Sequence, residues 1–249
     1  MRKFFALFIS SFIAIGCTFA FSGCTIGNTN KEPFQSGYYM CRSFNDEYID
    51  IISLSEEGQK QKFLVLPLDI DGIPVVHISD RAMWGCRETQ WESDTLEKIY
   101  ALKKYEVIYE DVFDGCTNLD KVISLYRNSG LPIPSTSAKV YHPRYFYENR
   151  SNNTEWQAPA NVSFLWNFED AENEGYYWID DLDYGEKITL IPDEPIRKGY
   201  RFTGWYKDPE CIDLWDFSSD TTPAEQFDED GNLVYQETCL YAGWMIVGG

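Results

Sequence analysis

Histidine and positive charge are both scarce in this sequence. Among 249 residues there are two histidines, His77 and His142, and 21 Lys and Arg stand against 40 Asp and Glu, giving a formal net charge of −19. Two histidines so far apart cannot form an H-E-x-x-H metalloprotease helix or a His-rich zinc cluster. The shortage of cations argues against nucleic-acid binding, because each phosphate contact needs a positive group to replace released counterions.

Apolar residues, by contrast, are plentiful. The chain is 44% hydrophobic and 16% aromatic, which is enough to fill a core and too much for a disordered protein. Arg2 and Lys3 precede an uncharged run from Phe4 to Gly23, the pattern of an export signal. About 20 apolar residues can also span a bilayer, so an uncleaved helix is an alternative, as is plain secretion.

The end of this run resembles the lipobox of bacterial lipoproteins. Ser22 and Gly23 stand directly before Cys24, although Phe21 departs from the usual Leu. The resemblance implies that the Cys24 thiol is acylated and anchors the protein to the membrane. We therefore expect a lipoprotein signal peptide at residues 1–23 and a polar tether at 24–45. The chain after residue 23 has 19 basic and 40 acidic residues, a net charge of −21.

Two internal similarities point to a repeat. Residues 80–86 return as residues 110–116, displaced by 30, and residues 96–99 return as 119–122, displaced by 23. A 7-residue insertion within 87–95 reconciles the two displacements. A period of 23 lies in the range of leucine-rich repeats, and residues 64–78 supply a further coil upstream.

These coils resemble the BspA-like leucine-rich repeats of bacterial surface proteins. The positions that fit the repeat unit are Leu96, Ile99, Ala101, Tyr105, Ile108, Val112, Phe113, Gly115 and Cys116. The resemblance implies a short leucine-rich-repeat solenoid at residues 46–130, with Cys86 and Cys116 buried and a glycine permitting a tight turn. Leu102 departs from the expected Pro. Residues 131–160 are then a cap or linker.

The last part of the chain shows short strands and turns. Strands are expected at 162–166, 188–191, 200–206 and 239–244. The strings G-Y-R-F-T-G-W-Y at 199–206 and L-Y-A-G-W at 240–244 resemble the Listeria-Bacteroides repeat, or internalin B-repeat, over residues 162–245. That resemblance implies a β-grasp-like module at 161–249 with no known active site. The expected fold class is mainly β with short helices and turns.

Acidic residues crowd this module. Residues 161–249 contain 20 acidic and 5 basic residues, with the densest clusters at 180–183 and 228–230. Calcium prefers such oxygen ligands. The spacing lacks the D-x-D-x-D-G register of an EF-hand, so we expect a solvated acidic surface, with calcium binding as the alternative, and no cofactor or metal.

Three adjacent aromatics, Tyr176, Tyr177 and Trp178, are the candidate ligand contacts. Neighbours on a strand alternate between faces, so at least one must turn toward solvent or a partner, unless two cover the strand edge. Cys211 and Cys239 could form a disulfide if their Cα atoms lie within about 7 Å. With Cys24 acylated and the signal removed, an odd number of cysteines is left, so a complete disulfide framework is excluded.

No nucleophile and base stand out for catalysis. His77 lies in an expected strand and His142 in the expected linker, so we expect no enzyme. The resemblances imply a lipid-anchored, extracytoplasmic protein of the bacterial surface that binds or adheres without catalysis. Its partner would be a host or neighbouring-cell protein or glycan. The alternatives are a carbohydrate-capture component of a surface uptake system, a hydrolase accessory or cryptic enzyme, and a structural spacer.

Overall fold

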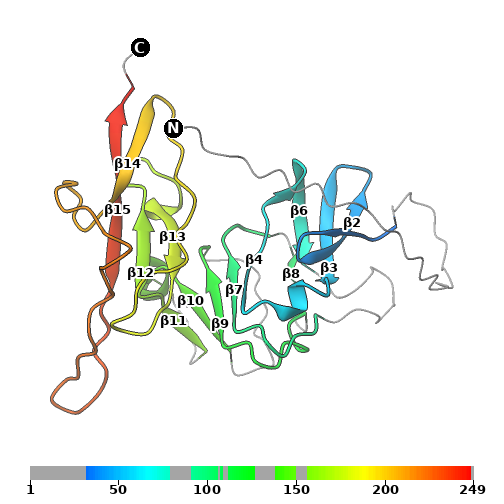
Figure 1. Ribbon diagram of the computed structural model, residues 1–249, viewed down its shortest axis with the longest axis horizontal. Coiled ribbons are helices and arrows are strands. Elements are labelled where there is room, and N and C mark those ends of the chain that lie inside the picture. Colours follow the sequence, from blue (N-terminus) through cyan, green and yellow to red (C-terminus); the bar gives the residue numbers. More distant parts are fainter. Residues whose placement is uncertain are drawn as a thin grey trace.

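The computed structural model describes residues 32–78, 91–105, 107–108, 112–126, 138–149 and 156–247 (Figure 1). Within these residues the protein is mainly β: fifteen strands form three sheets, beside one short α-helix and two 3-10 turns, η1 (Gly58–Lys60) and η2 (Asn173–Gly175). No helix in this described part is long and apolar enough to span a bilayer. The predicted signal, with Cys24, lies outside the described residues.

The N-terminal sheet begins antiparallel and continues parallel. Its strands are β1 (Phe34–Ser36), β2 (Tyr39–Phe44), β3 (Tyr48–Leu54), β6 (Ile73–Ile78), β5 (Asp69–Ile70) and β8 (Val107–Ile108). Strands β3, β6 and β8 pair in parallel, whereas β1 and β2 join by hairpins. The predicted tether is therefore wrong over residues 34–44, because alternate residues of β2, such as Cys41, are buried in the core and hold it there.

The ladder sheet consists of five parallel strands in chain order. They are β4 (Phe63–Val65), β7 (Lys98–Ala101), β9 (Lys121–Ser124), β10 (Lys139–His142) and β11 (Gln157–Pro159). The chain passes from β6 of the N-terminal sheet to β7 of the ladder sheet, returns to β8, and crosses again to β9. Each circuit thus adds one strand to each sheet, side by side with the previous one (Figure 1).

The strand registers reproduce both displacements seen in the sequence. Ile78 lies opposite Ile108 across β6 and β8, a displacement of 30 residues. Ile99 lies opposite Val122 across β7 and β9, a displacement of 23. Equivalent residues of successive units therefore stack on one another, because a one-residue slip would turn the apolar set away from the core.

One apolar core fills the space between these two sheets. Ile51, Val75 and Ile78 of the N-terminal sheet and Ile99 and Val122 of the ladder sheet belong to it. Cys116 is fully buried there, as predicted, whereas Cys86 lies outside the described residues.

Gly115 lies in a turn, as predicted, and it also makes a close backbone contact in this core. Its φ is not positive, but a Cβ at this position would overlap the carbonyl oxygen of Trp91. The amide of Ser93 donates to the Gly115 carbonyl at 3.2 Å, so the two backbones run close together. Close approach, not a left-handed conformation, explains the glycine.

The stretch predicted as a cap or linker, residues 131–160, belongs to the ladder sheet where the structure describes it. Strands β10 and β11 extend that sheet, and α1 (Arg144–Glu148) lies between them. His142, expected in a linker, ends β10 and is 2% exposed. The apolar Val140 adds one more layer to the core and so holds the segment on the sheet.

The C-terminal sheet has four strands in the order β13 (Tyr176–Asp180), β12 (Val162–Leu165), β15 (Thr238–Ile246) and β14 (Tyr200–Tyr206). Strands β12 and β15 are parallel, and the outer pairs are antiparallel. Phe164, Trp205, Trp215 and Leu240 fill its own core. Three of the four predicted strands are confirmed. The exception is 188–191, which pairs with no strand in the described residues, whereas β13 contains the three adjacent aromatics at 176–178.

Candidate functional site: the face of the ladder sheet

Two rows of side chains lie on the outer face of the ladder sheet. Lys98, Lys121 and Lys139 begin β7, β9 and β10 and lie opposite one another in the register. Two residues further on, Tyr100 and Ile123 point the same way, because alternate residues of a strand share a face. The intervening apolar residues face the core instead. The outer face therefore combines a row of lysines about 5 Å apart with a row of large apolar groups.

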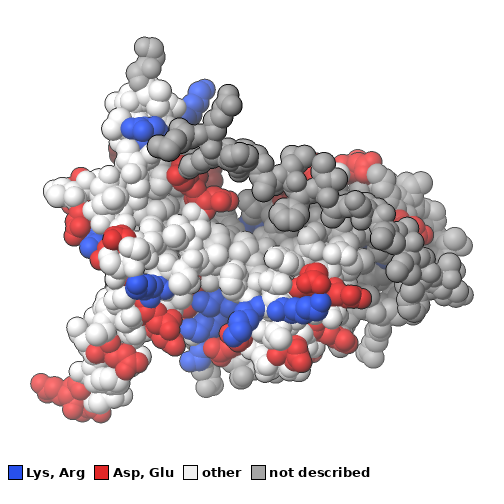
Figure 2. Space-filling model, viewed as in Figure 1, with Lys and Arg blue, Asp and Glu red and all other residues white. Residues whose placement is uncertain are grey.

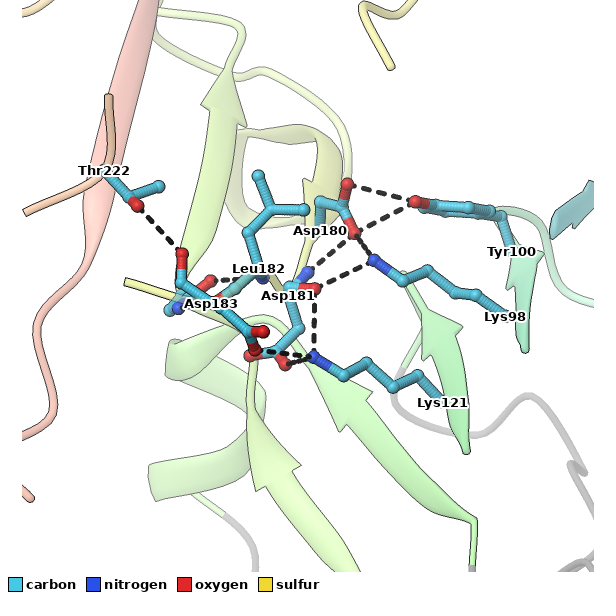
Figure 3. A network of polar contacts seen from close by, with 9 residues as sticks. Lys98, Tyr100, Lys121, Asp180, Asp181, Leu182, Asp183 and Thr222 are labelled. Carbon is cyan, nitrogen blue, oxygen red and sulfur yellow. Dashed lines mark hydrogen bonds and ion pairs between the residues drawn. The ribbon is translucent and has the colours of Figure 1, made fainter. Parts of the chain in front are cut away.

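The acidic end of β13 covers two of these lysines, Lys98 and Lys121 (Figure 3). Lys98 Nζ donates to Asp180 Oδ1 and to the Asp181 carbonyl oxygen, each at 2.8 Å. Lys121 Nζ donates to Asp181 Oδ2 at 2.7 Å. The Tyr100 hydroxyl lies 3.0 Å from both carboxylate oxygens of Asp180 and donates to that group. Asp180 and Asp181 of the first acidic cluster are thus docking residues and not a solvated surface, whereas the Asp183 side chain is 84% exposed.

The charged groups of this network are largely buried, so each charge is costly unless an opposite charge faces it. The side chain of Asp180 is 2% exposed and that of Lys98 is 17% exposed. Burial raises the pKa of the Tyr100 hydroxyl, and the neighbouring Asp180 carboxylate raises it further, so this group stays a proton donor. Burial also opposes the charge of Lys121, but the Asp181 and Asp183 carboxylates outweigh it and raise the lysine's pKa.

Asp181, the partner of Lys121, has a pKa that burial raises although Lys121 lowers it. The raised pKa of Lys121 keeps its ammonium charged, and that charge favours the ionised form of Asp181 against the effect of burial. The charges cannot be separated without cost, because a buried charge that loses its partner is strongly destabilising.

An apolar cluster beside the ion pairs joins the two parts of the chain. Tyr100, Ile123 and Leu125 of the ladder sheet pack with Ala160 and Ile179. The ring of Trp178 on β13 lies 5.4 Å from the ring of Tyr100, measured between centroids. The C-terminal module therefore packs against the ladder sheet and is not a separate domain at the end of a linker.

In the docked arrangement, the three predicted ligand-contact aromatics make contacts within the chain. Trp178 packs on Tyr100, and the Tyr176 hydroxyl accepts a hydrogen bond from the Tyr145 amide at 3.3 Å. Tyr177 packs on Trp166, with ring centroids 4.7 Å apart. None of the three is an exposed platform. The alternation of faces along a strand required at least one of the three to face solvent or a partner. For Trp178 that partner is the ladder sheet of the same chain.

The structure corrects the disulfide expectation. Cys211 and Cys239 are both free thiols. The Cys211 sulfur lies 3.4 Å from the Asn167 side-chain nitrogen and 3.8 Å from the Ala242 carbonyl oxygen. Cys239 lies next to Glu237, and burial raises the pKa of its thiol to about 12. The two sulfurs thus have separate environments.

The second acidic cluster forms a turn. Asp228 Oδ1 accepts hydrogen bonds from the amides of Asp230 and Asn232, at 3.0 and 2.8 Å. No group of three or more metal-ligating side chains occurs in the described part of the chain.

His77 lies in β6, as predicted, and its Nδ1 is 2.7 Å from Asp50 Oδ1 on the neighbouring strand β3. Burial raises the pKa of that aspartate, although His77 lowers it. The pair ties two strands of the N-terminal sheet together.

One end of the ladder face is left open. Phe63 and Val65 on β4 are 49% and 37% exposed, and Leu68 just beyond is 54% exposed. The Phe63 ring meets the edge of Tyr100, with centroids 6.5 Å apart, so this patch continues the covered apolar row. The sequence analysis missed it. The available signal was the alternation of faces along the strand, which turns Phe63 and Val65 away from the buried Leu64. That alternation does not tell which outward-facing residues the other module covers.

Residues 162–228 match the family model of the Listeria-Bacteroides repeat domain. The match takes in β12, β13 and β14 and stops before β15, so the predicted extent is confirmed up to residue 228. No curated protein and no solved structure matches the chain. The C-terminal module thus contains a Listeria-Bacteroides repeat, a repeat typical of bacterial surface proteins.

Proposed function

We propose that this protein is a non-catalytic binding or adhesion protein, held on the bacterial surface by a lipid on Cys24. The match at 162–228 supports a surface setting. The coincidence of strand registers with the 23- and 30-residue displacements supports a leucine-rich-repeat solenoid of BspA-like type over residues 46–130. The mixed four-stranded sheet is compatible with a β-grasp-like module at 161–249.

The observation that carries the proposal is the open end of the ladder face. Phe63 and Val65 on the edge strand β4 and Leu68 just beyond it form an exposed apolar patch, which we call the β4 patch. Sheet faces of repeat proteins present extended recognition surfaces. Exposed apolar side chains grouped in this way mark interaction sites more often than isolated ones do. The ligand class is a host or neighbouring-cell protein or glycan.

The test is a screen of the lipid-free chain from residue 24, with Cys24→Ala, against arrays of glycans and of surface proteins. A ligand should be lost when Phe63 and Val65 are both changed to Ser. Ile212→Ser is the matched control, because Ile212 is 82% exposed on the C-terminal module. A ligand that survives the double change and is lost with the control would contradict the proposal. Absence of any ligand would favour the structural spacer.

A glycan hit would turn the proposal toward carbohydrate capture. The eight tryptophans of the chain provide the readout, because a sugar stacking on an aromatic ring changes its fluorescence. Trp178 is packed at the junction, so a fluorescence change would have to come from another ring or from opening of the module.

The anchor needs its own experiment. Cells grown with a labelled fatty acid should incorporate the label into the parent chain and not into a Cys24→Ala variant. Equal labelling of the two would place the lipid on another residue, and absence of label from the parent would contradict acylation and leave the uncleaved helix or plain secretion.

A further inference from the structure

The two ends of β15 carry surfaces of opposite character. The strand runs nine residues, from Thr238 to Ile246, so its ends are about 30 Å apart. A hairpin precedes its first residue, and the start of β14 lies beside its last, as Tyr200 pairs with Ile246. Figure 1 shows the hairpin projecting from the lower end of this sheet and the β14–β15 pair rising at the upper end.

The upper end is basic and apolar, and we call it the basic tip. It consists of Ile196, Lys198, Arg201, Met245, Ile246 and Val247. Ile196 is 90% exposed, Ile246 72%, Val247 57% and Met245 51%. The register places Arg201 opposite Met245, and the Val247 amide donates to the Gly199 carbonyl at 3.0 Å, which gathers these residues.

Positive charge is rare in this module and is concentrated at the basic tip. Arg197, Lys198 and Arg201 are three of only five cations among residues 161–249. Arg197 is held in place between rings, 3.8 Å from the centroid of Tyr200 and 4.2 Å from that of Phe168. Within the described residues no ion pair joins Lys198 or Arg201 to an acidic group. Figure 2 shows blue atoms set among white ones at this upper end.

The lower end is acidic and apolar, and we call residues 225–234 the acidic hairpin. Phe227 bridges to Leu233, and the Val234 amide donates to the Gln226 carbonyl at 2.8 Å. Phe227 is 60% exposed and Leu233 51%. Four carboxylates surround them, those of Glu225, Asp228, Glu229 and Asp230, and no ion pair within the described part of the chain engages them. The projecting loop at the lower left of Figure 2 is red and white.

We propose that the basic tip of one copy docks on the acidic hairpin of a second copy. Each surface pairs exposed apolar groups with unneutralised charge, and the charges are opposite, so contact buries both apolar sets while pairing the ions. Because the two surfaces lie at opposite ends of β15, a contact that uses one surface of each copy leaves the other surface of each copy free. Such a heterologous contact can extend from copy to copy into a head-to-tail chain.

The overall charge sets the conditions for this association. Copies that are strongly negative repel one another at long range, but at about 0.15 M salt charges more than about 8 Å apart are largely screened. The contact pairs survive at that ionic strength because they are close. Each surface offers only a few apolar side chains, so the contact is weak and depends on a high local concentration of copies.

This inference goes beyond the proposed ligand binding, since it uses neither the β4 patch nor the anchor. The main alternative for the basic tip is an anionic lipid surface. That alternative leaves the acidic hairpin without a role, whereas a second copy uses both surfaces.

The test is sedimentation velocity of the lipid-free chain from residue 24, with Cys24→Ala, over a hundredfold range of concentration at 0.15 M salt. The average mass should rise with concentration and fall again at 0.6 M salt. Lys198→Glu with Arg201→Glu should leave a monomer. Glu229→Lys with Asp230→Lys should do the same, and it spares Asp228, which holds the turn.

Mixing the two variants is the decisive step. The reversed tip of one is complementary to the reversed hairpin of the other, so the mixture should regain association as an alternating chain. Lys62→Glu with Lys104→Glu is the matched control for the tip variant, because it makes the same change in net charge on the ladder, and it should associate like the parent. A parent that stays monomeric, or a mixture that stays monomeric, overturns the proposal. A monomer that binds phosphatidylglycerol vesicles through Lys198 and Arg201 overturns it in favour of a lipid surface.

Discussion

The Lys98 ammonium lies 2.8 Å from the Asp180 carboxylate and joins the second parallel strand of the ladder sheet to the last residue of β13. The two residues are 82 positions apart in the chain. Their pairing, with Tyr100 as a further donor, fixes where the C-terminal module sits on the ladder. The contact also decides which part of the ladder face stays open to ligands.

Lys98→Met should destabilise the protein by about 3 kcal/mol or more, because it leaves the Asp180 carboxylate buried without a cation, with only the Tyr100 hydroxyl and the Asp181 amide as donors. Urea unfolding followed by tryptophan fluorescence measures the change. Lys62→Met is the matched control. Its ion pair with Glu97 is exposed, with side-chain exposures of 73% and 55%, and its loss should cost less than about 1 kcal/mol. Adding Asp180→Asn to Lys98→Met should recover part of the loss, and a double variant less stable than Lys98→Met would contradict this account.

Gly115→Ala should destabilise the ladder by more than the usual surface substitution, that is, by more than about 0.5 kcal/mol. The new Cβ would overlap the Trp91 carbonyl oxygen, so the paired backbones at Ser93 and Cys116 must separate. Thermal unfolding by circular dichroism gives the readout. Thr117→Ala, two residues away at an exposed position, is the control and should change little. Equal effects of the two changes would show that Gly115 has no special backbone role.

Stability should fall as the pH rises above 9, partly through two buried thiols. Burial raises the pKa of Cys41 and of Cys116 to about 12, from a usual value of 9.0. The unfolded chain therefore loses these protons first, so alkali favours unfolding by up to about 1.4 kcal/mol per thiol and pH unit. Urea midpoints at pH 8, 9 and 10 should show a shallower decline for Cys116→Ala than for the parent. Parallel declines would mean that Cys116 titrates normally in the folded protein.

Native alkylation should distinguish the thiols by burial. Cys211 is partly exposed and should react first, whereas Cys41 and Cys116 are fully buried and should react only after unfolding. Mass spectrometry of the labelled peptides gives the order. The same digest without reduction should contain no peptide joining Cys211 to Cys239, and finding one would contradict the structure.

Local patterns predicted more of the fold than of the site. The 23- and 30-residue displacements predicted the stacking of Ile99 on Val122 and of Ile78 on Ile108, because register follows the buried apolar set. The match at 162–228 likewise follows a local string of residues, G-Y-R-F-T-G-W-Y at 199–206. The roles of Asp180 and Trp178 were not visible, since both depend on which residues of the ladder lie opposite them. Charge runs and aromatic runs look alike whether they face water or a second sheet.

The docked module also bears on how this protein can be dissected. A fragment stopped at residue 160 would uncover Tyr100 and Ile123 and leave Lys98 and Lys121 without their acidic partners. Such a fragment would expose apolar side chains between ammonium groups that repel one another, so we expect it to aggregate. The acidic module thus keeps the ladder sheet soluble, and surface display of the ladder requires the whole chain.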